Sequence, residues 1–138
     1  MDAIEISTDK SRLDIEVVHG FLTQSDWARG RSSDVIRKCI DGSFCVGAYS
    51  GGHQVGFVRA VTDMALFGYI FDVFVLEDHR GRGIGRLLIQ TLLQHPDLTG
   101  VKWMLRTSSA GPLYVKLGFN PLESADGLYI RKSDQETV

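Results

Sequence analysis

The sequence predicts one mixed α/β domain spanning residues 1–138, and two observations support this fold class. The chain has 138 residues, 43% of them hydrophobic and 23% charged, which is enough for a single buried core. Short segments with strand patterns alternate with segments whose apolar residues recur every three to four positions, as in helices. We find no internal repeat and no low-complexity tract that would divide the chain.

Strand patterns occur at seven places, and the strongest is Tyr69–Leu76. This segment is aromatic, β-branched and apolar on both faces except at Asp72, which is typical of a central strand. Residues 50–53 (Ser-Gly-Gly-His) predict a hairpin turn between the second and third strands. The expected strands span residues 3–7, 44–49, 54–61, 69–76 and 102–106, with a closing hairpin from 119–121 and 128–131.

Helix patterns lie between these strands. Asp14 and Ser33 are expected to cap two helices in the first half of the chain. The clearest helix is Ile84–Gln94, which has one apolar stripe and a polar opposite face. A fourth, short helix is expected to begin at Ser108 or Ser109. The sequence thus predicts about four helices around the sheet.

Composition excludes several function classes. The net charge of −2 argues against a general electrostatic grip on nucleic acid or on an anionic membrane. Apolar runs are too short for a membrane span, and the N-terminus lacks the apolar core of a signal peptide. We therefore expect a cytoplasmic protein with no nucleic-acid or membrane partner and no metal. Cys39 and Cys45 are interpreted as buried, reduced thiols.

The most informative segment is the glycine-rich turn at 80–86 (Arg-Gly-Arg-Gly-Ile-Gly-Arg), between the best strand and the best helix. Glycine lets the backbone approach a ligand closely, and the free amides of a first helical turn bind anions. Arg80, Arg82 and Arg86 add positive charge, so a diphosphate fits. The dinucleotide-fold spacing fails because Arg86 stands at the third glycine position, and the P-loop lysine is missing. A glycine-rich turn without a ligand is the structural alternative.

The sequence resembles the GNAT acetyltransferase superfamily, as a compact bacterial-type single-domain member. Its pyrophosphate motif, Arg/Gln-x-x-Gly-x-Gly/Ala, matches Arg80, Gly83 and Gly85. A second motif, Ala-x-x-x-Tyr-x-x-x-Gly-Phe, matches 110–119 at all four fixed positions. The two motifs occur in the family's order, with a helix and a strand between them.

The resemblance implies a fold and an acyl donor. The expected fold is a mixed, mostly antiparallel central sheet that splays between the fourth and fifth strands, and acetyl-CoA would enter the gap. Its pantetheine would pair with the backbone of Phe74 and Val75. Thr107 stands where members often carry a cofactor-binding Asn, and we treat it as a variant. The implied cofactor-binding residues are Phe74, Val75, Arg80, Gly81, Arg82, Gly83, Ile84, Gly85, Arg86 and Thr107.

The resemblance also implies direct transfer of an acetyl group to an amine. Tyr114 is then the candidate general acid, the alternative being a core tyrosine. Asp72 is the candidate general base, because a lone acid in a central strand needs a reason. A purely structural acid is the alternative for Asp72, and Asp63 and Glu77 are rival bases.

Trp27 and Arg59 are candidate substrate-binding residues. Trp27 either lines the acceptor pocket or covers the core, and Arg59 would favour an acidic acceptor if it faces the pocket. The acceptor, a small molecule or a peptide amine, and the presence of a homodimer stay open. Two other functions are also open: a CoA-binding sensor or module without catalysis, and a transferase of longer acyl groups.

Overall fold

The structure is a computed structural model whose described residues are 3–122 and 127–131. The chain divides into two compact units, residues 1–106 and 107–138, and each is described by itself. The expectation of a single domain over 1–138 stays a prediction.

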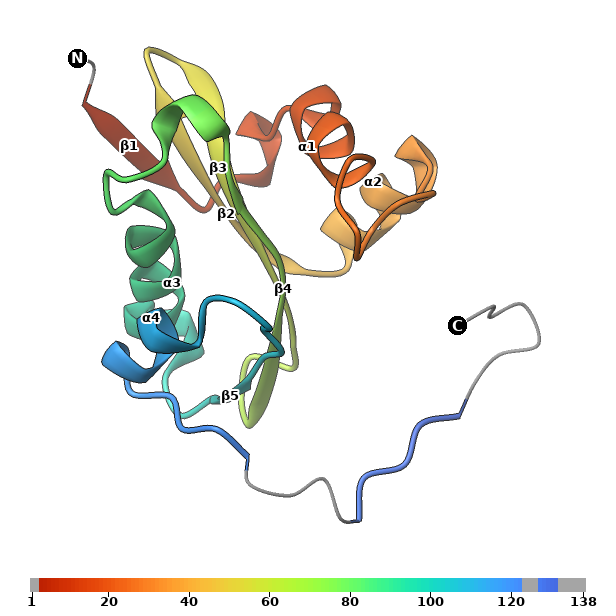
Figure 1. Ribbon diagram of the computed structural model, residues 1–138, viewed down its shortest axis with the longest axis vertical. Helices are drawn as coiled ribbons and strands as arrows, with labels where there is room; N and C mark the ends of the chain where they lie inside the picture. Colours follow the sequence, from red (N-terminus) through yellow and green to blue (C-terminus); the bar gives the residue numbers. More distant parts are fainter. Residues whose placement is uncertain (1–2, 123–126, 132–138) are drawn as a thin grey trace. The chain divides into compact units, whose positions relative to one another are not determined.

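The first unit contains a five-stranded sheet in the order β1-β2-β3-β4-β5 (Figure 1). Neighbouring strands are antiparallel except β4 and β5, which are parallel. The sheet is therefore mixed and mostly antiparallel, as predicted. The strands are β1 (Ile4–Ser7), β2 (Phe44–Ser50), β3 (His53–Thr62), β4 (Phe67–Val75) and β5 (Lys102–Met104).

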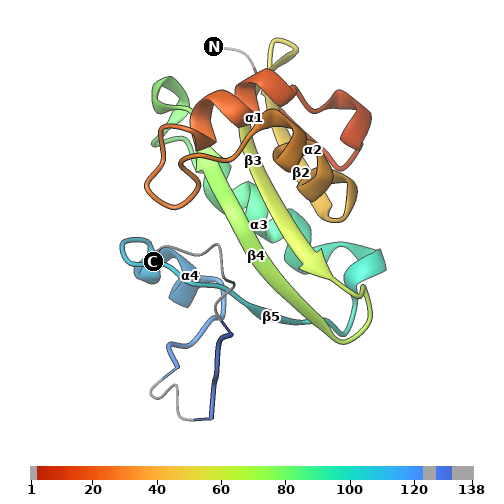
Figure 2. The ribbon, with the colours of Figure 1, turned by 90° about the vertical axis from the view of Figure 1, so that its right-hand side faces the viewer.

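Helices cover both faces of this sheet. The helices α1 (Ile15–Leu22) and α2 (Ser33–Asp41) lie on one face, and α3 (Ile84–Gln94) lies on the other (Figures 1 and 2). Apolar side chains of α1 and α2 pack with Phe57 and Phe74 of the sheet in one core cluster. Three short 3-10 turns complete the unit: η1 (Lys10–Arg12), η2 (Glu77–His79) and η3 (Pro96–Leu98).

The helix starts follow the expected capping chemistry, with one shift. The Asp14 carboxylate accepts hydrogen bonds from the amides of Glu16 and Val17, which confirms it as the cap of α1. The cap of α2 is Ser32 rather than Ser33, because the Ser32 hydroxyl accepts from the Val35 amide. Both serines have the right chemistry, and the sequence pattern does not distinguish adjacent caps.

A β-bulge interrupts the pairing of β3 with β4. Phe57 lies opposite Phe74, and Arg59 lies opposite Phe71. Two residues of β4 thus face a single residue of β3 between these pairs. Asp72 is one of the two and has a left-handed backbone, with φ of 57°, a conformation that Asp tolerates better than most residues. The bulge therefore changes the direction of the side chains halfway along β4.

The splay predicted between the fourth and fifth strands is present. β5 pairs only with the first three residues of β4, Phe67–Tyr69, and the two strands diverge from there (Figure 2). Within the described part of the first unit, the β5-facing edge of β4 from Ile70 to Val75 has no strand partner. This open edge carries backbone groups that are available to a ligand. β5 is shorter than the expected 102–106, because its pairing ends where the strands part.

The second unit holds the helix α4 (Gly111–Lys116). Its cap position is Ala110 rather than Ser108 or Ser109. The predicted closing hairpin is wrong for the described residues, since 119–122 and 127–131 contain no strand. The apolar run at 128–130 is exposed in the structure, and β-forming side chains need a paired strand and a buried face to form a strand.

Candidate active site

The turn before α3 is built to present backbone amides. Gly81 and Gly83 have φ of 78° and 77°, and Gly83 is the N-cap residue of α3. The first amides of a helix have no intrahelical acceptor, and the helix dipole places positive charge behind them. A Cβ built on either glycine would meet no atom within 4 Å. The turn that carries the first amides of α3, those of Ile84, Gly85 and Arg86, therefore has open space beside both of its left-handed glycines.

Three arginines surround this turn, as the sequence predicted. Arg80 and Arg86 are exposed, and Arg82 is partly buried. Arg80 also donates from Nε to the carbonyl of Val75, at 3.0 Å. The open backbone cradle, the helix N-terminus and the local positive charge together fit a diphosphate.

The adjacent part of β4 points backbone groups toward the open edge. The Leu76 amide donates to the Val55 carbonyl on β3 at 2.8 Å. Because a peptide unit is planar and trans, the carbonyl of the same unit, that of Val75, points away from β3. The Phe74 side chain is buried on the α1 face, where it stacks on Phe21 at 4.2 Å between ring centroids. The Val75 carbonyl thus faces the open edge, where it accepts from Nε of Arg80, and an extended ligand that pairs with it would have to take the place of this contact.

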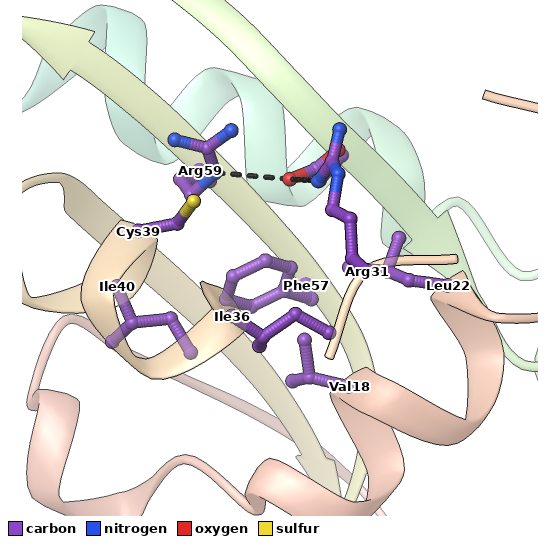
Figure 3. A pocket seen from close by; sticks show the side chains of 9 residues that line it. Val18, Leu22, Arg31, Ile36, Cys39, Ile40, Phe57 and Arg59 are labelled. Atoms are coloured by element: carbon purple, nitrogen blue, oxygen red, sulfur yellow. Dashed lines mark hydrogen bonds and ion pairs between the residues drawn. The ribbon is translucent and has the colours of Figure 1, made fainter. Parts of the chain in front are cut away.

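A buried charge cluster lies on the α1 and α2 face of β4. Nη1 of Arg31 and Nε of Arg59 both donate to Oδ2 of Asp72, at 2.8 and 2.9 Å. The Asp72 side chain is only 2% exposed. Its other oxygen, Oδ1, is buried and has no hydrogen-bond partner among the described residues. Figure 3 shows both arginines converging on this carboxylate above an apolar floor that includes Phe57 and Ile36.

This cluster changes the interpretation of Asp72. The sequence suggested either a general base or an acid bonded to backbone, whereas the structure pairs it with two guanidinium groups. Oδ2 is occupied by both arginines, so a proton would have to be accepted at Oδ1. Among the rival bases, Asp63 accepts three backbone amides of its turn, and these hydrogen bonds lower its pKa. Glu77 is exposed in η2.

Trp27 lies in the segment between α1 and α2. Its side chain is 56% exposed, and its ring contacts Phe21 at 6.3 Å between centroids. Phe21 in turn stacks on Phe74 of β4. The ring therefore extends an aromatic row outward from β4 and is not part of the closed core. Its role in binding the acceptor stays a prediction.

In the second unit, residues of the Ala-x-x-x-Tyr-x-x-x-Gly-Phe motif contact one another. Tyr114 lies on α4, and its ring meets Phe119 edge-on at 5.6 Å between centroids. The Phe119 amide donates to the Tyr114 carbonyl, and Gly118 between them has φ of 95°. Burial raises the pKa of the Tyr114 phenol above 10.0, so the hydroxyl is a hydrogen-bond donor at neutral pH.

Thr107 has a local structural role. Its hydroxyl oxygen accepts hydrogen bonds from the amides of Ser109 and Ala110, at 3.4 and 3.0 Å. These contacts shape the turn that leads into α4. Binding of the acyl donor by Thr107 stays a prediction.

Comparisons with known proteins decide the family. Residues 41–121, more than half of the chain, match the model of the acetyltransferase (GNAT) domain. The chain belongs to the GNAT acetyltransferase family. A curated Gibberella zeae protein whose name places it among the acetyltransferases is 30% identical over 148 residues, covering 89% of this chain and 82% of the relative.

Solved structures agree with this GNAT assignment. A Xanthomonas campestris pv. campestris protein assigned to the GNAT family is 41% identical, with 96% of this chain and 95% of that chain covered and a TM-score of 0.90. Glucosamine-6-phosphate N-acetyltransferase from Arabidopsis thaliana is 18% identical, with 94% and 100% covered and a TM-score of 0.67. The second likeness shows the shared fold alone.

Two structural features bear on the type of site in this GNAT protein. Within residues 3–122 and 127–131, no group of three or more His, Cys, Asp and Glu side chains is placed to hold a metal ion. No helix in the same residues is long and apolar enough to span a membrane.

Two residues that shape the candidate site, Arg31 and Ser43, were not predicted from the sequence. Arg31 stands in a polar, irregular segment between two helices, and Ser43 follows the end of α2. Ser43 accepts from Nη1 of Arg59 at 3.1 Å. Neither residue carries a pattern that marks it in a single sequence, because the contacts join segments that are distant in the chain.

Proposed function

We propose that this GNAT protein transfers an acetyl group from acetyl-CoA to a primary amine, by direct attack of the amine while both substrates are bound. The observation that carries the proposal is the open edge of β4 next to the amides at the N-terminus of α3. The first would pair with an extended pantetheine, and the second would bind a diphosphate. Pantetheine and a diphosphate are neighbouring parts of coenzyme A.

Named residues would perform the binding. The amides of Ile84, Gly85 and Arg86 would hold the pyrophosphate, with Arg80 and Arg82 balancing its charge. Backbone groups of Phe74 and Val75 would align the pantetheine along β4. Acetyl-CoA supplies the thioester whose acyl group is transferred. The open space at Gly81 and Gly83 supports this fit, because side chains there would occupy the cradle.

Two side chains would move protons. Tyr114 would donate a hydrogen bond from its hydroxyl to the departing thiolate, which its raised pKa supports by keeping the phenol neutral. Asp72 would accept a proton from the acceptor ammonium at Oδ1, since Oδ2 is taken by the two arginines. Because Oδ1 is buried in the structure, this transfer requires that binding of the acceptor expose it. The free thiols of Cys39 and Cys45 support the accompanying proposal of a cytoplasmic location.

The test is acetyl-CoA turnover with a panel of primary amines, followed as release of the free CoA thiol and as the mass of the acetylated amine. The expected result is amine-dependent thiol release with matching product. Tight acetyl-CoA binding without turnover of any amine would instead favour a binding module. A second series with propionyl-CoA and longer acyl-CoA esters separates an acetyltransferase from an enzyme for longer chains, because the longer esters should react more slowly.

A further inference from the structure

The cluster of Arg31, Arg59 and Asp72 carries an excess of positive charge. Both guanidinium groups pair with one carboxylate, at 2.8 and 2.9 Å. Among the ion pairs of the described residues, Asp72 is the only carboxylate partner of either arginine. The three groups therefore sum to +1. Because charge in a poorly hydrated site is unfavourable unless it is compensated, the cluster favours an anionic ligand.

The surroundings offer the cluster little compensation. The pocket that contains it is otherwise lined by apolar side chains and Cys39, and its interior has no room for a water molecule. The lining residues beside the cluster are Val18, Leu22, Ile36, Cys39, Ile40 and Phe57. A ligand would therefore meet the charges at the mouth of the pocket and not inside it.

The two arginines differ in how they are held. Arg59 donates to Asp72 and to the Ser43 hydroxyl, and its guanidinium lies 4.8 Å from the ring centroid of Phe71. Its side chain is 9% exposed. Arg31 donates to Asp72 from a single terminal nitrogen, and its side chain is 25% exposed. Since a guanidinium has five N–H donors, Arg31 is the group that can present donors to a ligand, while Arg59 and Asp72 hold it in place.

The position of the cluster assigns the anion to the acceptor. Asp72 precedes Val75 by three residues on β4, which is roughly 10 Å along a strand. The cluster lies on the α1 and α2 face of the sheet, whereas the proposed pyrophosphate site is at the start of α3, the helix of the other face (Figure 2). The phosphates of coenzyme A would thus be bound elsewhere, and the anion at Arg31 would belong to the second substrate.

We propose that the acceptor is an amine that also carries a carboxylate, and that Arg31 binds this carboxylate. The proposal rests on the proposed acetyltransferase function. A carboxylate matches the cluster in charge, because its single negative charge balances the excess of one, and in geometry, because a guanidinium binds it through two parallel hydrogen bonds. A phosphate monoester, with nearly two negative charges at pH 7, would overcompensate the cluster.

The test compares amines in matched pairs. Amino acids and ω-amino carboxylates of several lengths are assayed beside their primary amides, with O-phosphoethanolamine as the phosphate counterpart and rates referred to the concentration of neutral amine. We expect the best carboxylate to exceed its amide by about 10- to 100-fold in kcat/KM, as for one charged hydrogen-bonding pair. Arg31→Met should bring the ratio of the carboxylate rate to the amide rate close to one, and the comparison uses this ratio because the substitution also removes a partner of Asp72.

Controls separate the possible failures. Arg37→Met removes an exposed arginine of α2 that pairs with Asp34 and should leave the preference unchanged. Arg31→Lys keeps the positive charge but lacks the paired donors of a guanidinium, and it should retain part of the preference for the carboxylate. This variant also provides a test if Arg31→Met does not fold. Equal rates for carboxylates and amides, a preference that survives Arg31→Met, or a preference for the phosphate would refute the carboxylate site alone. Acetyl-CoA binding with no turnover of any amine would refute the proposed function and this inference with it.

Discussion

Arg59 and Asp72 lie on neighbouring strands, and Nε of Arg59 donates to Oδ2 of Asp72 at 2.9 Å. In a regular ladder this contact would not form. Arg59 is opposite Phe71, and the residue after Phe71 would point to the other face of the sheet. The bulge at Asp72, with its left-handed backbone, turns the carboxylate to the face that Arg59 occupies. The irregularity in β4 thus creates the charge cluster of the candidate site.

Removing the charge of Asp72 should destabilise the fold. Asp72→Asn keeps a residue that tolerates positive φ, but it leaves Arg31 and Arg59 close together without their shared carboxylate. We expect a loss of about 3–5 kcal/mol in the free energy of unfolding, measured by urea denaturation. In a double-mutant cycle with Arg59→Met, the combined loss should be smaller than the sum of the single losses. A loss below about 1 kcal/mol for Asp72→Asn would contradict a buried, interdependent cluster.

The same substitution tests Asp72 as the general base. At a temperature where Asp72→Asn is folded, turnover should fall most at neutral pH and recover partly at high pH, where more of the amine is already neutral. The measurement is the pH dependence of kcat/KM, with Asp63→Asn as the control because Asp63 serves its own turn. If the variant and the wild type share one pH profile, Asp72 is a structural and positioning residue only.

Much of this fold follows from patterns that are local in the sequence. The amphipathic stripe of α3, the Asp14 cap and the glycine-rich turn were predicted because each depends on residues within a few positions of one another. The bulge was not, since a single inserted residue leaves no periodic mark in a strand that is apolar on both faces. Arg31 was missed for a related reason: its partner Asp72 is 41 residues away, and a charged residue in a loop is ordinarily solvated.

Gly83 provides a test of the pyrophosphate site. Acetyl-CoA at 100 times its Kd should stabilise the wild type by about 2.7 kcal/mol, or roughly 10 °C in Tm. Gly83→Val should abolish this shift, because a branched side chain at the N-cap of α3 should obstruct a phosphate that binds the first helix amides. Gly52→Val is a matched control, since Gly52 has φ of 83° and open space around it but lies in the β2–β3 turn. Both variants carry backbone strain, and only Gly83→Val should lose the ligand-dependent shift.

Cys45 should make the fold sensitive to alkali. Burial raises the pKa of its thiol from 9.0 to about 11, so between these values the unfolded chain releases a proton that the folded chain keeps. The unfolded state is then favoured as the pH rises, and stability should fall by about 1 kcal/mol between pH 8 and pH 10. Denaturation at a series of pH values measures this slope.

Cys45→Ala should flatten this slope, leaving the smaller contribution of Tyr49 and Tyr114, whose pKa values are also raised. If stability falls as steeply with pH in the variant as in the wild type, other groups cause the pH dependence.

Tyr114→Phe tests the proposed general acid. The substitution removes only the hydroxyl, and the ring contact with Phe119 and the backbone bonds of the turn should persist. A thiolate is a tolerable leaving group near neutral pH, because the pKa of a thiol is about 8.5. The effect of the substitution on kcat therefore belongs at the lower end of general acid catalysis.

We expect kcat of Tyr114→Phe to fall by roughly 10²-fold with acetyl-CoA affinity little changed, as for an interaction made mainly in the transition state. Steady-state kinetics and a separate thermal-shift titration with acetyl-CoA measure the two quantities. Because burial raises the pKa of Tyr114, the wild-type phenol should stay protonated at neutral and mildly alkaline pH, and the ratio of the two kcat values should be constant from pH 7 to pH 9. A variant within about twofold of wild type, with chemistry limiting turnover, would show that Tyr114 serves the packing of α4 and not the reaction.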